Sequence, residues 1–248
     1  MAESRGIEVV VFDVLGTLVD EPGGLRAAIR EALLASDDAL DASDTSDAFD
    51  ASDVSDASVN ELLAVWQQHV ELEQRRIGQG RRPYASTEII DAEAAQRVAD
   101  HAGLADPAAI ARLATAGQRL PPWGDSVAGL ERLAQRFPVL GLSNAGRTAL
   151  LRLNAHAGLR WHQALSSEAV LAYKPAPEVY QFAIDTAGCP PERVLMVAAH
   201  SWDLRGARAR GMRTAYVQRP VGDPPTDSDL FDWRFKGLGE LVTALAMG

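Results

Sequence analysis

The sequence predicts an α/β fold: a Rossmann-like doubly wound parallel sheet as the core, with a helical cap inserted into it. Short apolar runs of strand length alternate with stretches of helical spacing, which is the βαβ rhythm of such a sheet. A long stretch between the first and second apolar runs shows only helical spacing. We therefore expect an α/β core at residues 1–22 and 123–248 and a cap at residues 23–122.

The expected strands are continuous apolar runs, as is typical of strands buried on both faces. They cover residues 7–13, 139–142, 194–198 and 214–217. Helical patterns separate the strands and cover residues 126–137, 147–157, 177–187 and 202–210. Gly211 ends the last of these helices, because glycine is favoured just past a helix C-terminus.

The expected cap consists of four further helical patterns, at residues 25–34, 60–77, 88–101 and 108–120. Pro121 and Pro122 close this block. Caps that cover the carboxyl ends of parallel strands shield a site from water, so we expect the site at that edge of the sheet.

Residues 36–58 interrupt the cap with eight aspartates and a nearly repeated nonapeptide that has aspartate at every third position. A period of three matches neither a helix nor a strand, so we interpret the segment as a disordered surface insertion. Calcium binding by the spaced aspartates is the alternative, although the segment lacks the glycine turns and the closing glutamate of calcium loops.

Charge and cysteine content exclude several classes of protein. The formal net charge is −10, but the tract at 36–58 contributes most of the acidic excess and the rest of the chain is nearly balanced. Nucleic-acid and anionic-membrane partners need clustered positive charge, so neither is expected. Cys189 is the only cysteine and can close no intrachain disulfide, and no apolar stretch approaches the roughly 20 residues that cross a bilayer. We expect a cytoplasmic protein.

Four short polar motifs follow the expected strands or begin the helices, where an open α/β sheet binds its ligands. They are Asp13-Val-Leu-Gly-Thr17, Leu142-Ser-Asn144, Lys174-Pro-Ala-Pro-Glu-Val-Tyr180 and His200-Ser-Trp-Asp203. A carboxylate that faces a lysine at the end of a buried strand stays ionised, and an ionised carboxylate can attack carbon or phosphorus. Asp13 is therefore the expected nucleophile, with Lys174 as its counter-charge and Thr17 and Ser143 as hydroxyl donors that orient it.

Several of these residues also have an alternative role, and Lys174 beside a polar turn would simply be solvated. Asp13 would cap the following turn, and Ser143 and Asn144 would cap a helix. Asp203 would be a favourable charge at a helix N-terminus, and Tyr180 would be a core aromatic.

The order of the four motifs resembles that of the haloacid dehalogenase superfamily. The spacing from Lys174 to Tyr180 and the Trp202-Asp203 pair are similar to its 2-haloacid dehalogenase branch. The resemblance implies that Asp13 displaces halide from C2 of a short (S)-2-haloacid, forming an aspartyl ester that water then hydrolyses to the 2-hydroxy acid. It also implies that Asp203 pairs with the lysine and helps to place the water, and that no organic cofactor is used.

The residue two positions after Asp13 separates two kinds of chemistry. Phosphatases that resemble this chain have an aspartate there, which protonates the departing alkoxide, whereas this chain has Leu15. A halide ion is a very weak base and leaves without a proton, so Leu15 favours carbon–halogen cleavage. The dehalogenase branch usually has tyrosine at this position.

Other positions also depart from the branch. The branch has an arginine after the cap tryptophan, where this chain has Gln67 after Trp66. It has asparagine at the position of His200, whose imidazole is either a base near neutral pH or a hydrogen-bond donor. Ala198 and Ala199 stand where the branch commonly has serines.

We therefore expect a hydrolase of a small halogenated carboxylate. The catalytic residues would be Asp13, Thr17, Ser143, Lys174, His200 and Asp203, and the substrate would contact Leu15, Gln67, Asn144, Tyr180 and Trp202. The alternatives are a hydrolase of a phosphate ester, a phosphonate or a strained C–N bond, and a catalytically silent binding protein of the same fold. Only phosphatase chemistry would call for Mg²⁺, held by Asp13 and Asp203. Whether two subunits form a homodimer stays open.

Overall fold

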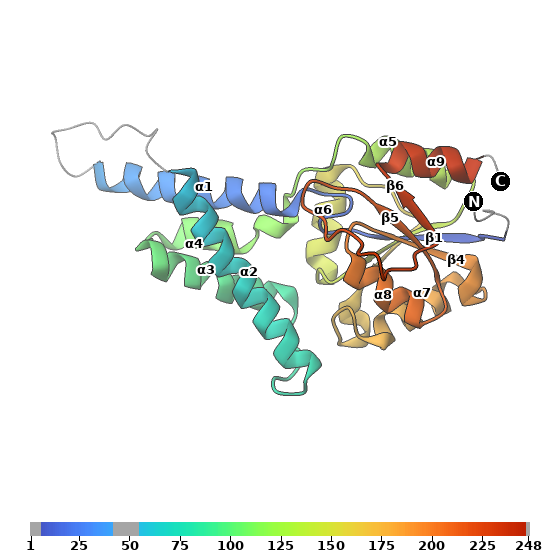
Figure 1. The fold of residues 1–248 in the computed structure, drawn as a ribbon. Helices are drawn as coiled ribbons and strands as arrows, with labels where there is room; N and C mark the ends of the chain where they lie inside the picture. Colours follow the sequence, from blue (N-terminus) through green and yellow to red (C-terminus); the bar gives the residue numbers. More distant parts are fainter. Residues whose placement is uncertain (1–5, 42–54, 247–248) are drawn as a thin grey trace. The chain divides into compact units, whose positions relative to one another are not determined.

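A parallel sheet forms the core of one of the two units of the chain (Figure 1). The computed structural model describes residues 6–41 and 55–246. Within these residues the sheet has six strands in the order β3-β2-β1-β4-β5-β6, and all neighbours are parallel. The strands are β1 (Val9–Asp13), β2 (Val139–Ser143), β3 (Gln163–Ser166), β4 (Val194–Ala198), β5 (Arg213–Val217) and β6 (Trp233–Phe235). The predicted doubly wound α/β fold is confirmed.

Helices cover both faces of this sheet, with α5 and α9 on one face and α7 and α8 on the other (Figure 1). Apolar side chains of the strands, such as Val11, Leu142 and Met196, pack with Val179 of α7 and Leu204 of α8 in one buried cluster. Burial of this size is the main stabilising term of such a core. The helices of the core are α5 (Ser126–Ala134), α6 (Arg147–Ala157), α7 (Pro177–Ala187), α8 (Ser201–Ala209) and α9 (Leu238–Ala246).

The end of β1 lies at the point in the sheet where the strand order reverses. From β1 the chain continues outward to β2 and β3, and it then returns to the other side of β1 for β4, β5 and β6. Ligands of open α/β sheets bind outside the carboxyl ends of the strands at this switch point. Asp13, the last residue of β1, pairs in register with Leu142 of β2.

The two edge strands β3 and β6 were not predicted from the sequence. The first half of β3 is exposed, and β6 is only three residues long with an exposed arginine between two aromatic residues. Edge strands are short and mixed in polarity, so they lack the continuous apolar run that identifies a buried strand.

Contacts divide the chain into two compact units, one of Met1–Glu21 with Pro121–Gly248 and one of Pro22–Leu120. The second unit is helical and contains most of α1 (Glu21–Asp41) together with α2 (Asp56–Gly78), α3 (Thr87–Ala102) and α4 (Pro107–Ala114). Ile90, Ala94 and Val98 lie on one face of α3 and are buried. Small alanines on a helix face allow neighbouring helices to approach closely.

The predicted disorder of residues 36–58 is wrong at both ends of the segment. Helix α1 continues through Asp41, and α2 begins at Asp56. Extending a helix that has already nucleated costs little, and Ser55 caps α2 by accepting a hydrogen bond from the Ser58 N–H. Residues 42–54, which include most of the repeat, lie outside the described residues.

The helix predicted for residues 108–120 is shorter than expected. Helix α4 ends at Ala114, and a 3₁₀ turn follows at Ala116–Gln118. The Thr115 hydroxyl donates to the Arg112 carbonyl oxygen, which competes with continued helical pairing. No helix among the residues that the structure describes is long and apolar enough to span a membrane.

Candidate active site

The carboxylate of Asp13 lies at the carboxyl end of β1 and is held by the loop that follows. The Thr17 hydroxyl donates to Asp13 Oδ2 at 2.6 Å and accepts from the Ala199 N–H at 2.9 Å. Thr17 therefore ties the nucleophile loop, residues 13–17, to the end of β4. Gly16 supplies the turn with a φ of 76°, in the left-handed region that favours glycine.

Lys174 joins the two central carboxylates. Its Nζ lies 2.9 Å from Asp13 Oδ1 and 2.8 Å from Asp203 Oδ2, and the Tyr180 hydroxyl donates to Asp203 Oδ1 at 2.7 Å. All four side chains are buried. A buried cation between two carboxylates offsets much of the cost of removing the charges from water.

Electrostatics favour the charged form of this lysine and the neutral form of the tyrosine. Burial opposes the charge on Lys174, but Asp13 and Asp203 outweigh burial and raise the pKa of its ammonium. Burial raises the pKa of Asp203 more than the Lys174 charge lowers it. Burial and the neighbouring Asp203 also raise the pKa of Tyr180, so its hydroxyl remains a hydrogen-bond donor.

The imidazole of His200 lies against the nucleophile loop. His200 follows β4 and is the N-terminal cap residue of α8. A Cβ added at Gly16 would lie 2.5 Å from His200 Nε2, so only a glycine leaves room for the ring. Trp202 stacks on the His200 ring, with ring centroids 5.8 Å apart and ring planes at 28°. The structure thus brings His200 beside the loop that bears Asp13.

Ser143 and Asn144 contact backbone groups. Ser143 is fully buried and its Oγ accepts from the Ala145 N–H at 3.1 Å. Asn144 Oδ1 accepts from the Lys174 N–H at 2.8 Å. Asn144 therefore positions the segment that presents the lysine, which is a supporting role.

The remaining residues predicted to contact substrate lie in different parts of the chain. Leu15 is half-buried within the nucleophile loop, where its backbone forms a bridge with Val19. Trp202 is 37% exposed at the start of α8. Gln67 is exposed on α2 of the helical unit, next to the buried Trp66.

Sequence reasoning missed Arg219, which supports the nucleophile loop from β5. Its Nε donates to the Thr17 carbonyl oxygen at 2.8 Å, and its Nη1 forms an ion pair with Asp125 at 2.7 Å. The guanidinium also lies 5.9 Å from the ring centroid of Trp123, whose indole N–H donates to the Gly16 carbonyl oxygen. The only sequence signal was an arginine placed just after a strand.

Glu21, the first residue of α1, was also missed. Its side chain is half-buried, and the charges of His200 and Asp13 both act on it. Burial, with Asp13 in addition and His200 in opposition, raises the pKa of Glu21 to about 7.

The described residues contain no group of three or more His, Cys, Asp or Glu side chains arranged to hold a metal ion. Asp13 and Asp203, the pair that a phosphatase would use for Mg²⁺, each accept a hydrogen bond from Lys174. These two carboxylates are thus already neutralised in part by the chain itself.

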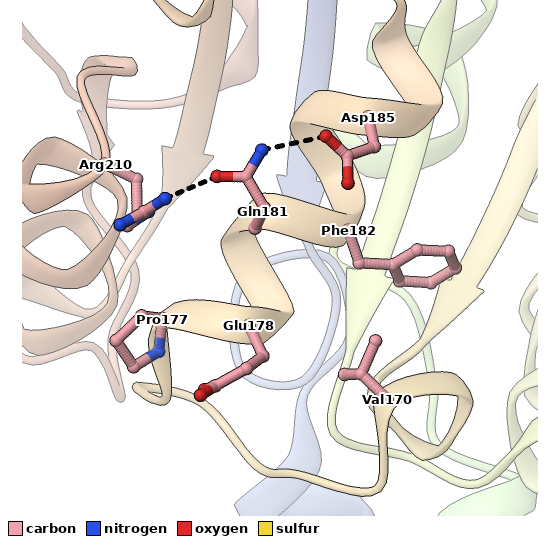
Figure 2. A pocket seen from close by; sticks show the side chains of 7 residues that line it. All are labelled: Val170, Pro177, Glu178, Gln181, Phe182, Asp185 and Arg210. Atoms are coloured by element: carbon pink, nitrogen blue, oxygen red, sulfur yellow. Dashed lines mark hydrogen bonds between the residues drawn. The ribbon is translucent and has the colours of Figure 1, made fainter.

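A surface hollow of about 360 Å³ beside α7 lies apart from this cluster, because none of its lining residues belongs to the cluster (Figure 2). Figure 2 shows that Gln181 bridges Asp185 and Arg210 across this hollow. Three of its polar side chains thus pair with one another, and none of the four motifs' site residues lines it.

Comparison with known proteins places the chain in a family. The model of haloacid dehalogenase-like hydrolases matches residues 7–211. The (S)-2-haloacid dehalogenase H-109 of Pseudomonas putida is 30% identical over 217 residues, which are 86% of each chain. The solved L-2-haloacid dehalogenase PA0810 has a TM-score of 0.76 at 30% identity and covers 97% of this chain and 100% of its own.

A second solved structure holds a covalently bound small acid. The L-2-haloacid dehalogenase of Xanthobacter autotrophicus with covalently bound chloropropionic acid is 25% identical, with a TM-score of 0.70 and coverage of 98% of this chain and 99% of its own. The matched residues contain all four motifs of the cluster. The chain therefore belongs to the haloacid dehalogenase-like hydrolases.

Proposed function

We propose that this protein hydrolyses short (S)-2-haloacids to 2-hydroxy acids through an ester on Asp13, without a metal or an organic cofactor. Two neighbouring features carry this proposal. Asp13 forms a buried ion pair with Lys174, and the residue two positions after it, Leu15, has no proton to donate to a leaving group. Relatives named as (S)-2-haloacid dehalogenases support the substrate class.

In the first step the carboxylate of Asp13 attacks C2 of the substrate and the halide leaves with the bonding electrons. Lys174 holds Oδ1 and the Thr17 hydroxyl holds Oδ2, so the carboxylate is oriented before the substrate arrives. Halide needs no general acid, which is consistent with a leucine at position 15. The product of this step is an aspartyl ester and a free halide ion.

In the second step water adds to Cγ of the Asp13 ester, and a base must accept its proton. Both oxygens of Asp203 already accept hydrogen bonds, from Lys174 and from Tyr180. The imidazole of His200, beside Gly16, is the remaining candidate from the motifs. Water oxygen thus enters the side chain of residue 13, and the substrate oxygen comes from the enzyme in the first turnover.

The test is halide release from (S)-2-chloropropionate. Asp13→Asn should abolish release, while Asp185→Asn, an exposed change on α7, should leave it unchanged. EDTA should not alter the wild-type rate. Hydrolysis of p-nitrophenyl phosphate that disappears with EDTA would replace the proposal with the phosphatase alternative.

Isotope labelling tests the covalent intermediate directly. After a single turnover in ¹⁸O water, the label should appear in the Asp13 side chain and not in the product. Label found only in the hydroxy acid would mean that water attacks the substrate without an enzyme ester.

A further inference from the structure

Thr17 stands between two amide groups whose carbonyl oxygens are held from outside the nucleophile loop. The indole N–H of Trp123 donates to the Gly16 carbonyl oxygen at 3.0 Å, and Arg219 Nε donates to the Thr17 carbonyl oxygen at 2.8 Å. Because an amide group is planar, each of these hydrogen bonds also fixes the N–H of the residue that follows. The backbone on both sides of the Thr17 Cα is therefore held in place.

The Thr17 side chain transfers this orientation to the nucleophile. Thr17 is fully buried, and its hydroxyl donates to Asp13 Oδ2 at 2.6 Å and accepts from the Ala199 N–H at 2.9 Å. A β-branched side chain is stiff at χ1, so the direction of the hydroxyl follows the direction of the backbone. The position of the attacking carboxylate thus depends on the two amide groups, and small displacements of a reacting group are costly.

The two donors are themselves held in place. The Arg219 guanidinium lies 5.9 Å from the ring centroid of Trp123 and forms an ion pair with Asp125 at 2.7 Å. Asp125 Oδ2 in turn accepts from the N–H of Leu238, the first residue of α9, at 2.9 Å. Donors that are already ordered lose little conformational freedom when they form a hydrogen bond, so they can fix the loop.

The segment that carries Trp123 is paired with the chain that follows the nucleophile loop. The Trp123 N–H donates to the Leu18 carbonyl oxygen at 3.0 Å, and the Asp20 N–H donates to the Pro121 carbonyl oxygen at 2.8 Å. These two segments run antiparallel. The backbone of Trp123 is thus fixed relative to the loop, and its indole reaches back to Gly16.

We propose that Trp123, together with Arg219, aims the nucleophile for its attack on the substrate. The two donors fix the amide groups on either side of Thr17, and the Thr17 hydroxyl passes this orientation to the carboxylate of Asp13. Trp123 and Arg219 act through Thr17 and are therefore positioning residues. This inference rests on the proposed function, because it concerns the step in which Asp13 displaces halide.

The main test is Trp123→Phe, which removes the indole N–H and keeps an aromatic ring beside Arg219. Rapid-quench measurement with (S)-2-chloropropionate should show first-turnover halide release about tenfold slower than in the wild type. The KM of steady-state release should stay within twofold, since the lost hydrogen bond orients the nucleophile and not the substrate. Arg219→Lys, which keeps the charge beside Asp125 and lacks the planar donor group, should give the same kind of loss.

Trp161→Phe is the matched control, because it removes the same ring volume and an indole N–H that makes no hydrogen bond. Trp161 Nε1 is buried and has no hydrogen-bond partner among the residues that the structure describes. Its ring also lies near the nucleophile strand, 6.4 Å from the ring centroid of Phe12. This variant should release halide within twofold of the wild-type rate, and urea unfolding should show that both variants are folded under the assay conditions.

A double variant tests the route through Thr17. Thr17→Val keeps the β-branched shape and removes the hydroxyl that contacts Asp13. In the Thr17→Val background, Trp123→Phe should slow first-turnover halide release by less than twofold, against about tenfold with the hydroxyl present. The effects of residues that act through one shared contact are not additive.

Three results would overturn this inference: a first-turnover rate of Trp123→Phe within twofold of the wild type, an equal loss in Trp161→Phe, or an equal effect of Trp123→Phe with and without the Thr17 hydroxyl. Absence of halide release by the wild type is a different outcome, because it refutes the proposed function itself and this inference falls with it.

Discussion

Lys174 is the residue on which the charge balance of the site depends. Its ammonium contacts a carboxylate on either side, and the three groups are almost completely buried. Without the ammonium, two carboxylates would share a site removed from water. Such a site resists double ionisation, because like charges in a poorly solvated place raise each other's pKa.

Lys174→Met should therefore abolish halide release and lower the free energy of unfolding by about 3–5 kcal/mol at pH 8. The loss should be smaller at pH 5, because protonating one carboxylate removes the repulsion. Urea unfolding at both pH values measures this difference. Lys236→Met, which changes an exposed lysine, is the control, and an equal loss at both pH values would contradict the charge argument.

Glu21 has the opposite relation between pH and stability from that of a salt-bridged carboxylate. Its pKa is about 7 in the folded chain against an ordinary 4.5, so its contribution to stability is fully present below pH 4.5 and is lost as pH rises toward 7. Glu21→Gln should raise the free energy of unfolding by up to ~3 kcal/mol at pH 8 and leave it nearly unchanged at pH 4. The measurement is urea unfolding of the wild type and of Glu21→Gln at several pH values. A difference in the free energy of unfolding that stays constant from pH 4 to pH 8 would show that ionised Glu21 does not destabilise the fold.

At the scale of elements, the nucleophile loop and the residue after it are held by groups at the ends of two strands and by a helix. The Thr17 hydroxyl accepts a hydrogen bond from the Ala199 N–H at the end of β4. The Arg219 guanidinium, at the end of β5, donates to the Thr17 carbonyl oxygen. Ser126, in the first turn of α5, donates its hydroxyl to the Leu18 carbonyl oxygen at 2.7 Å. Backbone groups of the loop are thus satisfied from outside the loop, which fixes its position relative to the sheet.

Arg219→Met should lower the turnover rate about tenfold, since small displacements of a reacting group are costly. Steady-state halide release and urea unfolding together check this prediction. Arg213→Met is a matched control: Arg213 also pairs with an aspartate, Asp232 at 2.8 Å, and stacks on a tryptophan, Trp233 at 5.1 Å, but it lies at the start of β5. Equal losses of turnover in the two variants would mean that the effect is general destabilisation.

At the scale of the whole molecule, two compact units divide the chain, and the charged cluster belongs entirely to one of them. Asp13, Lys174, His200 and Asp203 all lie in the unit of Met1–Glu21 and Pro121–Gly248. The acidic repeat lies in the other, between the end of α1 at Asp41 and the start of α2 at Asp56. Its composition offers little apolar surface to bury, so neither unit should depend on its sequence.

Replacing residues 42–54 by a Gly-Ser linker of equal length should leave turnover within a few-fold of the wild type. The helix ends at Asp41 and Ser55 stay intact in this design, including the cap that Ser55 provides for α2. Steady-state halide release at several substrate concentrations is the measurement. A large loss of turnover would show that the repeat takes part in ordering a catalytic element.

The sequence predicted correctly those features that depend on neighbouring residues, such as apolar runs and short motifs. The four central strands are continuous apolar runs, and Asp13, Lys174 and Asp203 stand in motifs that an α/β sheet brings to one edge. It failed at the edge strands β3 and β6, whose stability comes from pairing with a neighbour and not from their own composition. The contact of Asn144 with the Lys174 N–H was likewise outside its reach, because the two residues lie 30 positions apart and an amide side chain suits several partners.

The amino-acid sequence alone determined the α/β class, the central strands and the position of Asp13 at the end of a buried strand, because hydrophobic periodicity and motif order are properties of neighbouring residues. Only the tertiary structure decided that Lys174 bridges Asp13 and Asp203, that Arg219 holds the loop at Thr17, and that burial raises the pKa of Glu21. These contacts join residues far apart in the chain, and burial sets their strength. Both depend on the folded arrangement of the whole core.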